Sequence, residues 1–118
     1  MAVLLLVGSD PSGTLGKGTA ALNLLAHDLR TAPADATALT ESSRADVVVI
    51  DGTTDLANAR VICRLFGSSG ITLPLLLVLS EGGFAAVTPE WGVADVVLET
   101  AGPAELDARI RLLMGNNP

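Results

Sequence analysis

The sequence predicts an α/β fold in which five parallel strands form a doubly wound sheet with helices on both faces. The apolar residues fall in short continuous runs, VLLLV, VVVI, LPLLLVL and VVL. Continuous rather than alternating runs are typical of strands that are buried on both faces. Segments of helical periodicity lie between these runs, and alternating strands and helices indicate a parallel sheet. At 118 residues the chain is expected to form one domain.

The first half of the chain is expected to hold three strands and two helices. The run at 3–7 is the first buried strand, and leucines spaced near 3.6 residues predict a helix at about 15–28. A short second strand is expected at 29–33 and a short helix at 35–43. The β-branched run at 46–51 is the third strand, and it ends on a carboxylate.

The second half is expected to continue the alternation. It should hold strands at 75–79 and 95–98 and helices at 55–67, 83–90 and 103–114. The helix at 55–67 has its apolar residues on one side, and 83–90 is expected to be a short helix. In the last helix, Pro103 suits the first helical position and Glu105 lies in the first turn, where the helix dipole favours anions. The order fits a flavodoxin-like (CheY-like) sheet, whose sites form at the carboxyl ends of the strands.

Composition narrows the function classes. Affinity for nucleic acid rests on lysine and arginine, yet 13 acidic residues outnumber 7 basic ones and the net charge is −6. We therefore expect no DNA binding by this domain itself.

No apolar run approaches the ~20 residues of a membrane span, and the start MAVLLL lacks the basic region of a signal peptide. A single cysteine, Cys63, is expected in the core, and the cytoplasm is the expected location.

The glycine-rich loop at 8–19 raises the question of nucleotide binding, because Gly16-Lys17-Gly18-Thr19 opens a helix. A phosphate-binding loop needs a glycine five residues before Gly16, where this chain has Pro11, which has no N–H to offer a phosphate. A nucleotide-binding enzyme that uses this loop is kept as a third alternative. The stretch VVVIDGTTDL also lacks the nucleophile of the haloacid-dehalogenase signature, because Val49 stands at that position.

The strand ends together resemble a known family. A buried run ends in Asp51, the next strand is followed by Ser80, and WGVADVVLETAGPAELDARIRLL closes the chain. Over Gly92 to Ile110 this stretch resembles the G-A-D-D-Y-L-x-K-P…E-L-x-A-R-I pattern of OmpR-type receiver domains of response regulators. The stretches LLAHDLR, PLLLVLSEGGFAAV and LETAGPAELDARIRLL are similar to GlnR, the atypical response regulators of nitrogen metabolism in actinobacteria.

In receivers, an aspartate accepts a phosphoryl group from a histidine kinase, helped by Mg²⁺, a hydroxyl and a lysine. The resemblance makes Asp51 the acceptor and Ser80 the hydroxyl. The remaining pocket is degenerate, since the acid pair, lysine and proline of the family have been replaced, and its residues are Gly8, Ser9, Asp10, Thr53, Ser80, Glu99 and Thr100. The aromatic residue of the fifth strand is replaced by Val96.

These replacements bear on catalysis. Phosphoryl transfer depends on metal and cationic groups. One unit charge at ~4 Å is worth about 4 kcal/mol at an effective dielectric near 20. We therefore predict that Asp51 is not phosphorylated and that the domain has no catalytic residues, metal or cofactor. The runner-up is an ordinary receiver that is phosphorylated on Asp51. Two roles stay open for an unphosphorylated Asp51: a carboxylate satisfied by turn N–H groups and by Ser9, Thr53 or Ser80, or a permanent charge that organises the pocket.

The resemblance implies a homodimer formed through helix 4, strand 5 and helix 5. In that family an aspartate that opens strand 5 bridges to the partner's arginine, and the corresponding residues here are Asp95 and Arg109. The expected interface comprises Phe84, Val87, Trp91, Asp95, Glu105, Arg109 and Arg111. Packing of Trp91 within the monomer is an equal alternative. His27 is expected at the surface or as a cap at the end of the first helix.

The domain division follows from the same resemblance. Residues 1–114 are expected to form the receiver domain, and 115–118 to begin a linker to a C-terminal winged-helix DNA-binding domain outside this chain. The expected function is regulation of nitrogen-metabolism genes by a phosphorylation-independent dimer. DNA contact is expected only through that second domain, and RNA polymerase is an expected partner of the full-length protein.

Overall fold

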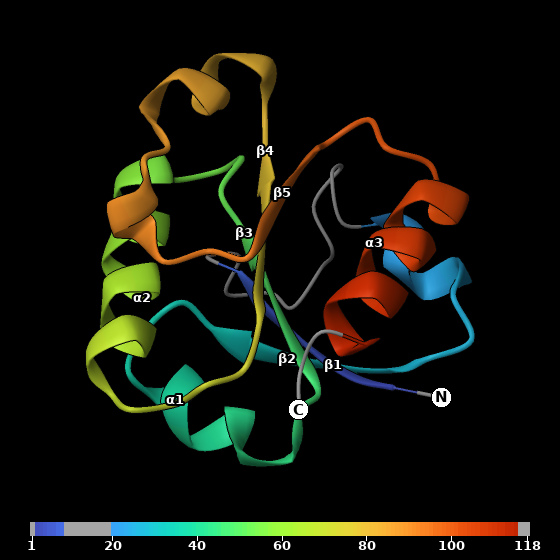
Figure 1. Ribbon diagram of the computed structural model, residues 1–118, viewed down its shortest axis with the longest axis horizontal. Helices are drawn as coiled ribbons and strands as arrows, with labels where there is room; N and C mark the ends of the chain where they lie inside the picture. Colours follow the sequence, from blue (N-terminus) through green and yellow to red (C-terminus); the bar gives the residue numbers. More distant parts are fainter. Residues whose placement is uncertain (1, 9–19, 116–118) are drawn as a thin grey trace.

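The computed structural model describes residues 2–8 and 20–115 of the chain. Five parallel strands form one sheet in the order β2-β1-β3-β4-β5 (Figure 1). The strands are β1 (Val3–Gly8), β2 (Asp28–Pro33), β3 (Val47–Asp51), β4 (Leu75–Leu79) and β5 (Asp95–Leu98). This is the flavodoxin-like order, so the predicted fold class and the weakly patterned second strand are confirmed.

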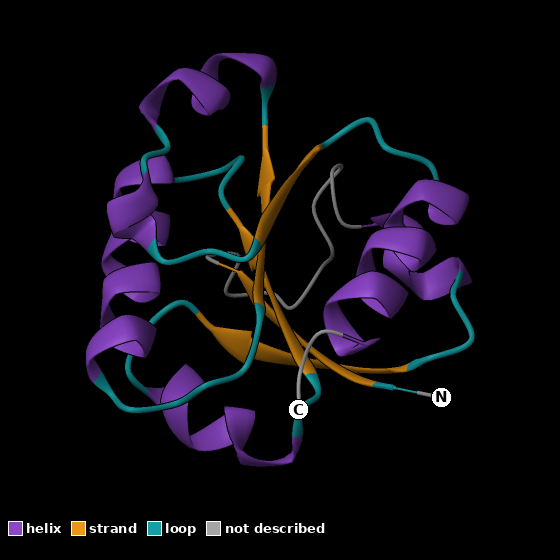
Figure 2. Cartoon of the chain, in the orientation of Figure 1, coloured by secondary structure: helices purple, strands orange, loops and turns teal. Residues whose placement is uncertain are grey.

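Helices cover both faces of the sheet (Figure 2). The α-helices are α1 (Thr37–Glu41), α2 (Leu56–Ser68) and α3 (Pro103–Gly115). Short 3₁₀ segments are η1 (Ala20–Leu24), η2 (Ser42–Arg44), η3 (Glu81–Ala86) and η4 (Pro89–Trp91). Among the helices in the described ranges, none combines the length and the apolar character that a membrane crossing requires.

Two predicted helices differ from the structure. Within the described part of the segment 15–28, the helical residues end at Leu24, because Asp28 already pairs with Val3 in the sheet. The predicted helix at 83–90 is two 3₁₀ segments, η3 and η4. Val87 and Thr88 between them are extended, as expected for residues that precede Pro89, which disfavours helical geometry before it and has no N–H to donate.

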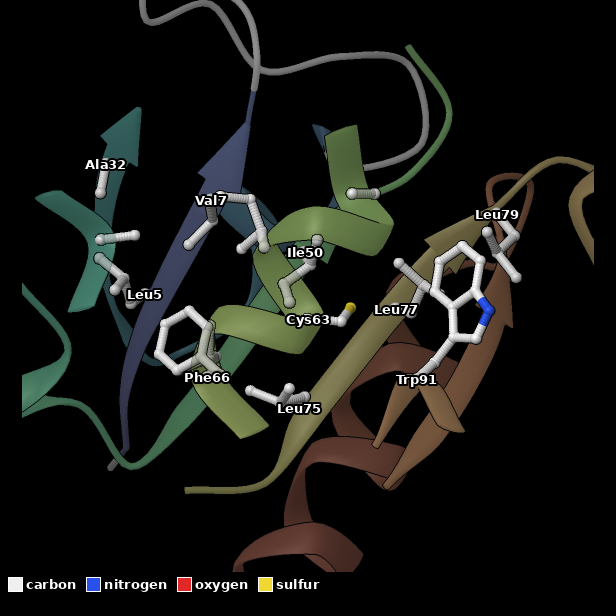
Figure 3. Close-up of a cluster of buried hydrophobic side chains, with 14 residues drawn as sticks. Leu5, Val7, Ala32, Ile50, Cys63, Phe66, Leu75, Leu77, Leu79 and Trp91 are labelled. Atoms are coloured by element: carbon white, nitrogen blue, oxygen red, sulfur yellow. The ribbon is translucent and has the colours of Figure 1, made fainter. Parts of the chain in front are cut away.

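The strands alternate side chains between two cores, one on each face of the sheet. In β3, Val48 and Ile50 face α2, whereas Val47 and Val49 face α3 and η1. The first core includes Cys63, whose thiol has its pKa raised to about 11 by burial, so its prediction as a core residue is confirmed. Figure 3 shows this core, with Phe66 of α2 packed over β1 and β3.

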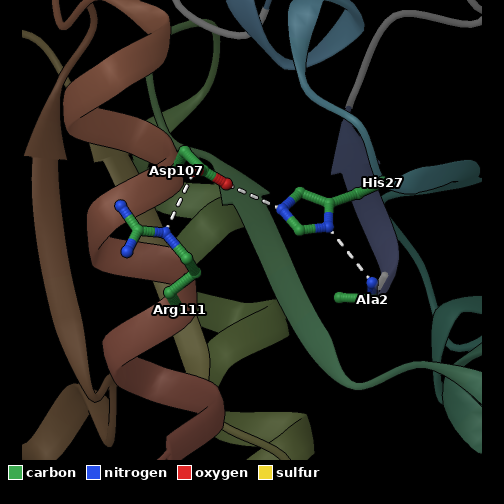
Figure 4. Close-up of polar contacts among 4 residues, drawn as sticks. All are labelled: Ala2, His27, Asp107 and Arg111. Atoms are coloured by element: carbon green, nitrogen blue, oxygen red, sulfur yellow. Dashed lines mark hydrogen bonds and ion pairs between the residues drawn. The ribbon is translucent and has the colours of Figure 1, made fainter.

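A partly buried histidine joins the start of the sheet to α3 (Figure 4). Nδ1 of His27 accepts a hydrogen bond from the N–H of Ala2 at 3.1 Å, so Nε2 carries the proton and donates it to Oδ1 of Asp107 at 2.8 Å. This hydrogen bond lowers the pKa of Asp107, and Arg111 adds to the effect. The prediction of a surface or helix-capping role for His27 was wrong, since its side chain is only 11% exposed and connects two elements.

We expect His27→Ala to lower the free energy of unfolding by about 1–3 kcal/mol, because the fully buried N–H of Ala2 then lacks an acceptor. Arg111→Ala is the control, since it removes an exposed partner of the same Asp107 carboxylate and should cost less than about 1 kcal/mol. Urea denaturation of both variants measures the difference. Equal losses would show that the histidine bridge adds nothing beyond a surface contact.

Candidate functional site

The candidate site lies where the strands end, at the carboxyl edge of the sheet. Asp51 is the last residue of β3 and is in register with Val78 of β4. On the other side of β4, the N–H of Glu99 donates to the carbonyl of Leu79 at 2.8 Å. Two half-buried acidic residues, Asp51 and Glu99, therefore flank the end of β4, on backbones that are two strand spacings or about 10 Å apart.

The predicted pocket is brought together only in part. Gly8 ends β1 and Ser80 follows β4, so both lie at this same edge, whereas Thr100 is exposed beyond β5. Ser9 and Asp10 lie outside the described residues, as does most of the glycine-rich loop at 8–19. The structure therefore bears on Asp51, Thr53, Ser80 and Glu99, and not on the first-strand acids or on nucleotide binding.

The Asp51 carboxylate is held by its own turn. Oδ1 accepts hydrogen bonds from the backbone N–H of Thr53 at 2.9 Å and from the Thr53 hydroxyl, and Oδ2 accepts one from the Thr54 hydroxyl at 3.3 Å. No hydrogen bond joins the side chains of Ser80 and Asp51, although the structure describes both residues. Thr53 is thus confirmed as a partner of Asp51. Thr54 was missed, although the D-G-T-T sequence carries the signal of an Asx turn with two hydroxyls.

Gly52 fixes the direction of this turn. Its N–H donates to the carbonyl of Val78 at 2.8 Å. A Cβ at this position would lie 3.0 Å from both Cδ2 of Leu79 and the Val78 carbonyl oxygen. Because the backbone of β4 cannot yield as a flexible side chain can, only glycine fits here without displacing neighbours. The close approach holds the Asp51 turn against the end of β4.

The candidate site contains two acidic residues, Asp51 and Glu99, that lack a described cationic partner. Neither Asp51 nor Glu99 takes part in any ion pair among the described residues. Magnesium prefers carboxylate oxygens, but β1 ends in Gly8, which has no side chain. Within 2–8 and 20–115, no three His, Cys, Asp or Glu side chains are grouped to hold a metal. Of the positions that the family uses to hold magnesium, the structure describes Gly8 and Asp51, and both oxygens of the Asp51 carboxylate accept hydrogen bonds.

A second feature lies between β5, α3 and η3. Nη1 of Arg109 lies 3.0 Å from Oδ2 of Asp95, and its Nε lies 3.1 Å from Oε2 of Glu105. The hydrogen bond to Asp95, followed by that to Glu105, raises the pKa of the Arg109 guanidinium. This cluster borders a groove of about 380 Å³ that also includes Phe84 and Thr100. We call it the β5–α3 groove.

The structure places the predicted interface residues at three locations. Phe84, which is 37% exposed, lies with the Arg109 cluster on the β5–α3 groove. Arg111 instead pairs with Asp107 beside His27. Val87 is half-buried against the core on the α2 side.

Trp91 belongs to the same core and is only 4% exposed, next to Leu77 in Figure 3. The prediction of Trp91 as an exposed interface residue was wrong, and the alternative of packing within the monomer is confirmed. The large ring packs in the same buried cluster as the β4 side chains Leu75, Leu77 and Leu79.

Comparison with known families decides the classification. The family model described as "Transcription regulator GlnR, N-terminal domain" matches residues 1–114. The chain belongs to this GlnR family. The resemblance to GlnR that LLAHDLR, PLLLVLSEGGFAAV and LETAGPAELDARIRLL indicated is thereby confirmed. No curated protein sequence matches this GlnR-type domain.

Solved structures similar to this GlnR-type domain include response regulators and their receiver domains. A response regulator receiver domain protein from Clostridium thermocellum has a TM-score of 0.77 and 15% identity over 98% of this chain and 95% of its own. A Chloroflexus aurantiacus J-10-fl protein assigned as a response regulator has a TM-score of 0.77 and 19% identity, covering 98% of both chains. NtrX from Brucella abortus, in complex with ADP, has a TM-score of 0.74 and 17% identity over 97% of this chain. This chain spans 26% of NtrX.

We expect Gly52→Ala to destabilise the GlnR-type domain by about 1–3 kcal/mol through overpacking against β4. Gly67→Ala is the matched control, because a Cβ there has nothing within 4 Å and alanine favours the helix. The free energies of unfolding in urea give the comparison. If Gly52→Ala were as stable as Gly67→Ala, the close approach would not constrain the site.

Proposed function

We propose that this domain is the receiver of a transcription regulator of nitrogen metabolism that acts as a homodimer without phosphorylation of Asp51. The observation that carries the proposal is the pair of carboxylates, Asp51 and Glu99, on either side of the end of β4, without a described cation at either. The GlnR family match supports the regulatory role.

The electrostatics of the site disfavour a phosphoryl group. Phosphorylation adds about two negative charges and three acceptor oxygens at pH 7. Transfer requires a metal or cations that offset charge on the equatorial oxygens. At the position where a conventional receiver has its lysine, this domain has Glu99, which adds repulsion. The donors of Thr53 and Thr54 already bind the Asp51 oxygens, so they hold the carboxylate in one position at the centre of the turn.

The dimer is proposed through the β5–α3 groove, with a contribution from η3. The Asp95–Arg109 pair, which the family forms between protomers, lies within one chain here. In a two-fold dimer each exchanged pair would replace an equivalent pair within a protomer, so the exchange gains little free energy. Burial of the apolar side chain Phe84 therefore supplies more of the stabilisation than the ion pairs do.

The whole protein completes the proposal. A C-terminal winged-helix domain, joined by a linker that begins near residue 115, would bind DNA as paired half-sites set by the receiver dimer. RNA polymerase would be its partner at promoters, and the cytoplasm its location. The acidic receiver would contribute the pairing and not the DNA contact, in keeping with its net charge of −6.

Incubation with acetyl phosphate and Mg²⁺ tests the absence of phosphorylation. We expect intact mass spectrometry to show no stoichiometric phosphoryl adduct on this domain, while a conventional receiver in the same reaction acquires one. A wild-type adduct that disappears in Asp51→Asn would instead establish the ordinary phosphorylatable receiver, which Asp51 and Ser80 by themselves favour.

Sedimentation equilibrium tests the dimer. We expect Phe84→Ser to raise the dissociation constant of the dimer at least tenfold, which is about the loss expected for removing one buried aromatic contact. Arg109→Ala should have a smaller effect, because its pairs form within the monomer. Val61→Ser is the control, since Val61 is exposed but lies on α2, away from the groove. A strict monomer at millimolar concentration would refute dimerisation through this face.

A further inference from the structure

A second groove lies on the other side of η3, between α2 and the η3–η4 segment. Its volume is about 520 Å³, within the range of ligand-binding clefts. Its walls are formed by Ala57, Arg60, Val61 and Arg64 of α2 and by Ala86 and Trp91 of the η3–η4 segment. We call it the α2 groove.

The helix α2 has two different stripes. Its buried stripe comprises Ala59, Ile62, Cys63 and Phe66. The stripe on the groove runs through 57, 60, 61 and 64, at the i, i+3, i+4, i+7 spacing that lines up side chains along two turns of one helix face. The side chain of Val61 at its centre is 54% exposed, so an apolar position faces solvent between two arginines.

The arginines of this stripe, like Arg44 on η2, differ from the other three arginines in the structure. Arg30, Arg109 and Arg111 each pair with a carboxylate. Arg60 and Arg64 form no ion pair with any described residue, although the chain carries a net charge of −6. Four residues apart, they lie about 6 Å from each other along the helix axis. The α2 groove therefore presents two positive charges, one turn apart, on either side of an apolar centre.

We propose that the α2 groove binds an acidic amphipathic helix of a partner protein. Such a helix places two carboxylates one turn apart opposite Arg60 and Arg64 and sets an apolar side chain against Val61 and the Trp91 wall. The proposal does not rest on the proposed dimer or on the state of Asp51, because the groove lies on α2 and not on β5 or α3.

A second copy of this chain does not match the α2 groove. Among the described helices, α3 is the one with more than one acidic residue, and its Glu105 and Asp107 already pair with Arg109 and Arg111. Glu41 is the single acid of α1. None of the described α-helices therefore offers two unpaired carboxylates one turn apart to this groove.

The test titrates the domain with three synthetic helical peptides of equal length. The first carries glutamates four residues apart beside a leucine stripe, the second has lysines in place of the glutamates, and the third is a scrambled form of the first. We expect only the first to bind, with ¹⁵N shift changes confined to α2 and to the η3–η4 segment. Trp91 is the single tryptophan of the chain, so its fluorescence reports the same event.

Charge-reversal variants sharpen the test. Arg60→Glu and Arg64→Glu should each weaken binding of the acidic peptide by about fivefold or more. Arg44→Glu is the matched control, because Arg44 is also exposed and outside the described ion pairs but lies on η2. At domain concentrations below the dimer dissociation constant, Phe84→Ser should leave peptide affinity unchanged, which separates failure of this proposal from failure of the dimer.

Four results would overturn the proposal. They are no binding at millimolar peptide, equal binding of the lysine peptide, shift changes on β5 or α3 instead of α2, and an Arg44→Glu effect as large as that of Arg60→Glu. Decanoate is titrated alongside as a small aliphatic carboxylate. Shift changes in α2 with decanoate but with no peptide would assign the groove to a small anionic amphiphile and not to a helix.

Discussion

Burial of the central strands on both faces is the constraint on which the rest of this structure depends. The side chains of β3 and β4 pack into two cores at once, one under α2 and one under α3 and η1. Polar chemistry is therefore confined to the strand ends and to the outer surfaces of the helices. The Asp51 turn, the β5–α3 groove and the α2 groove all lie at such places. Gly52 shows how closely the two regions meet, since its backbone touches the last residues of β4.

The net charge of −6 is an average over three regions of the domain in which the charges are arranged differently. At the carboxyl edge of the sheet, hydroxyl and N–H donors hold the Asp51 carboxylate, and Glu99 is a second carboxylate outside the described ion pairs. On α3, each arginine is matched with a carboxylate within the chain. On α2, two arginines have no described partner. Recognition by this domain therefore depends on where its charges lie as well as on its net charge, because steering and recognition follow the local electrostatic potential.

The local pattern of apolar residues in the sequence predicted most of this fold. The predictions that were wrong involve residues that contact others far away in the sequence. Continuous apolar runs located the strands, and Asp51 and Glu99 were found because parallel strands end at one edge. The end of the first helix was misplaced because Asp28 pairs with Val3, a contact that helical periodicity does not contain. The roles of His27 and Trp91 likewise depend on residues far along the chain, Asp107 for one and the β4 side chains for the other. The sequence did indicate that Asp95 and Arg109 interact, but only the three-dimensional placement could show that they meet within one chain.

The short η3 segment has a mechanical consequence. Phe84 borders one groove and Ala86 the other, so a stretch of three residues forms a partition between two surfaces. If η3 moves toward a molecule bound in one of the two grooves, it moves away from the other groove. Thermodynamic linkage is reciprocal, so occupancy of either surface would change the affinity of the other by the same factor. A receiver with such a partition has a route for communication that requires no covalent modification of its central aspartate.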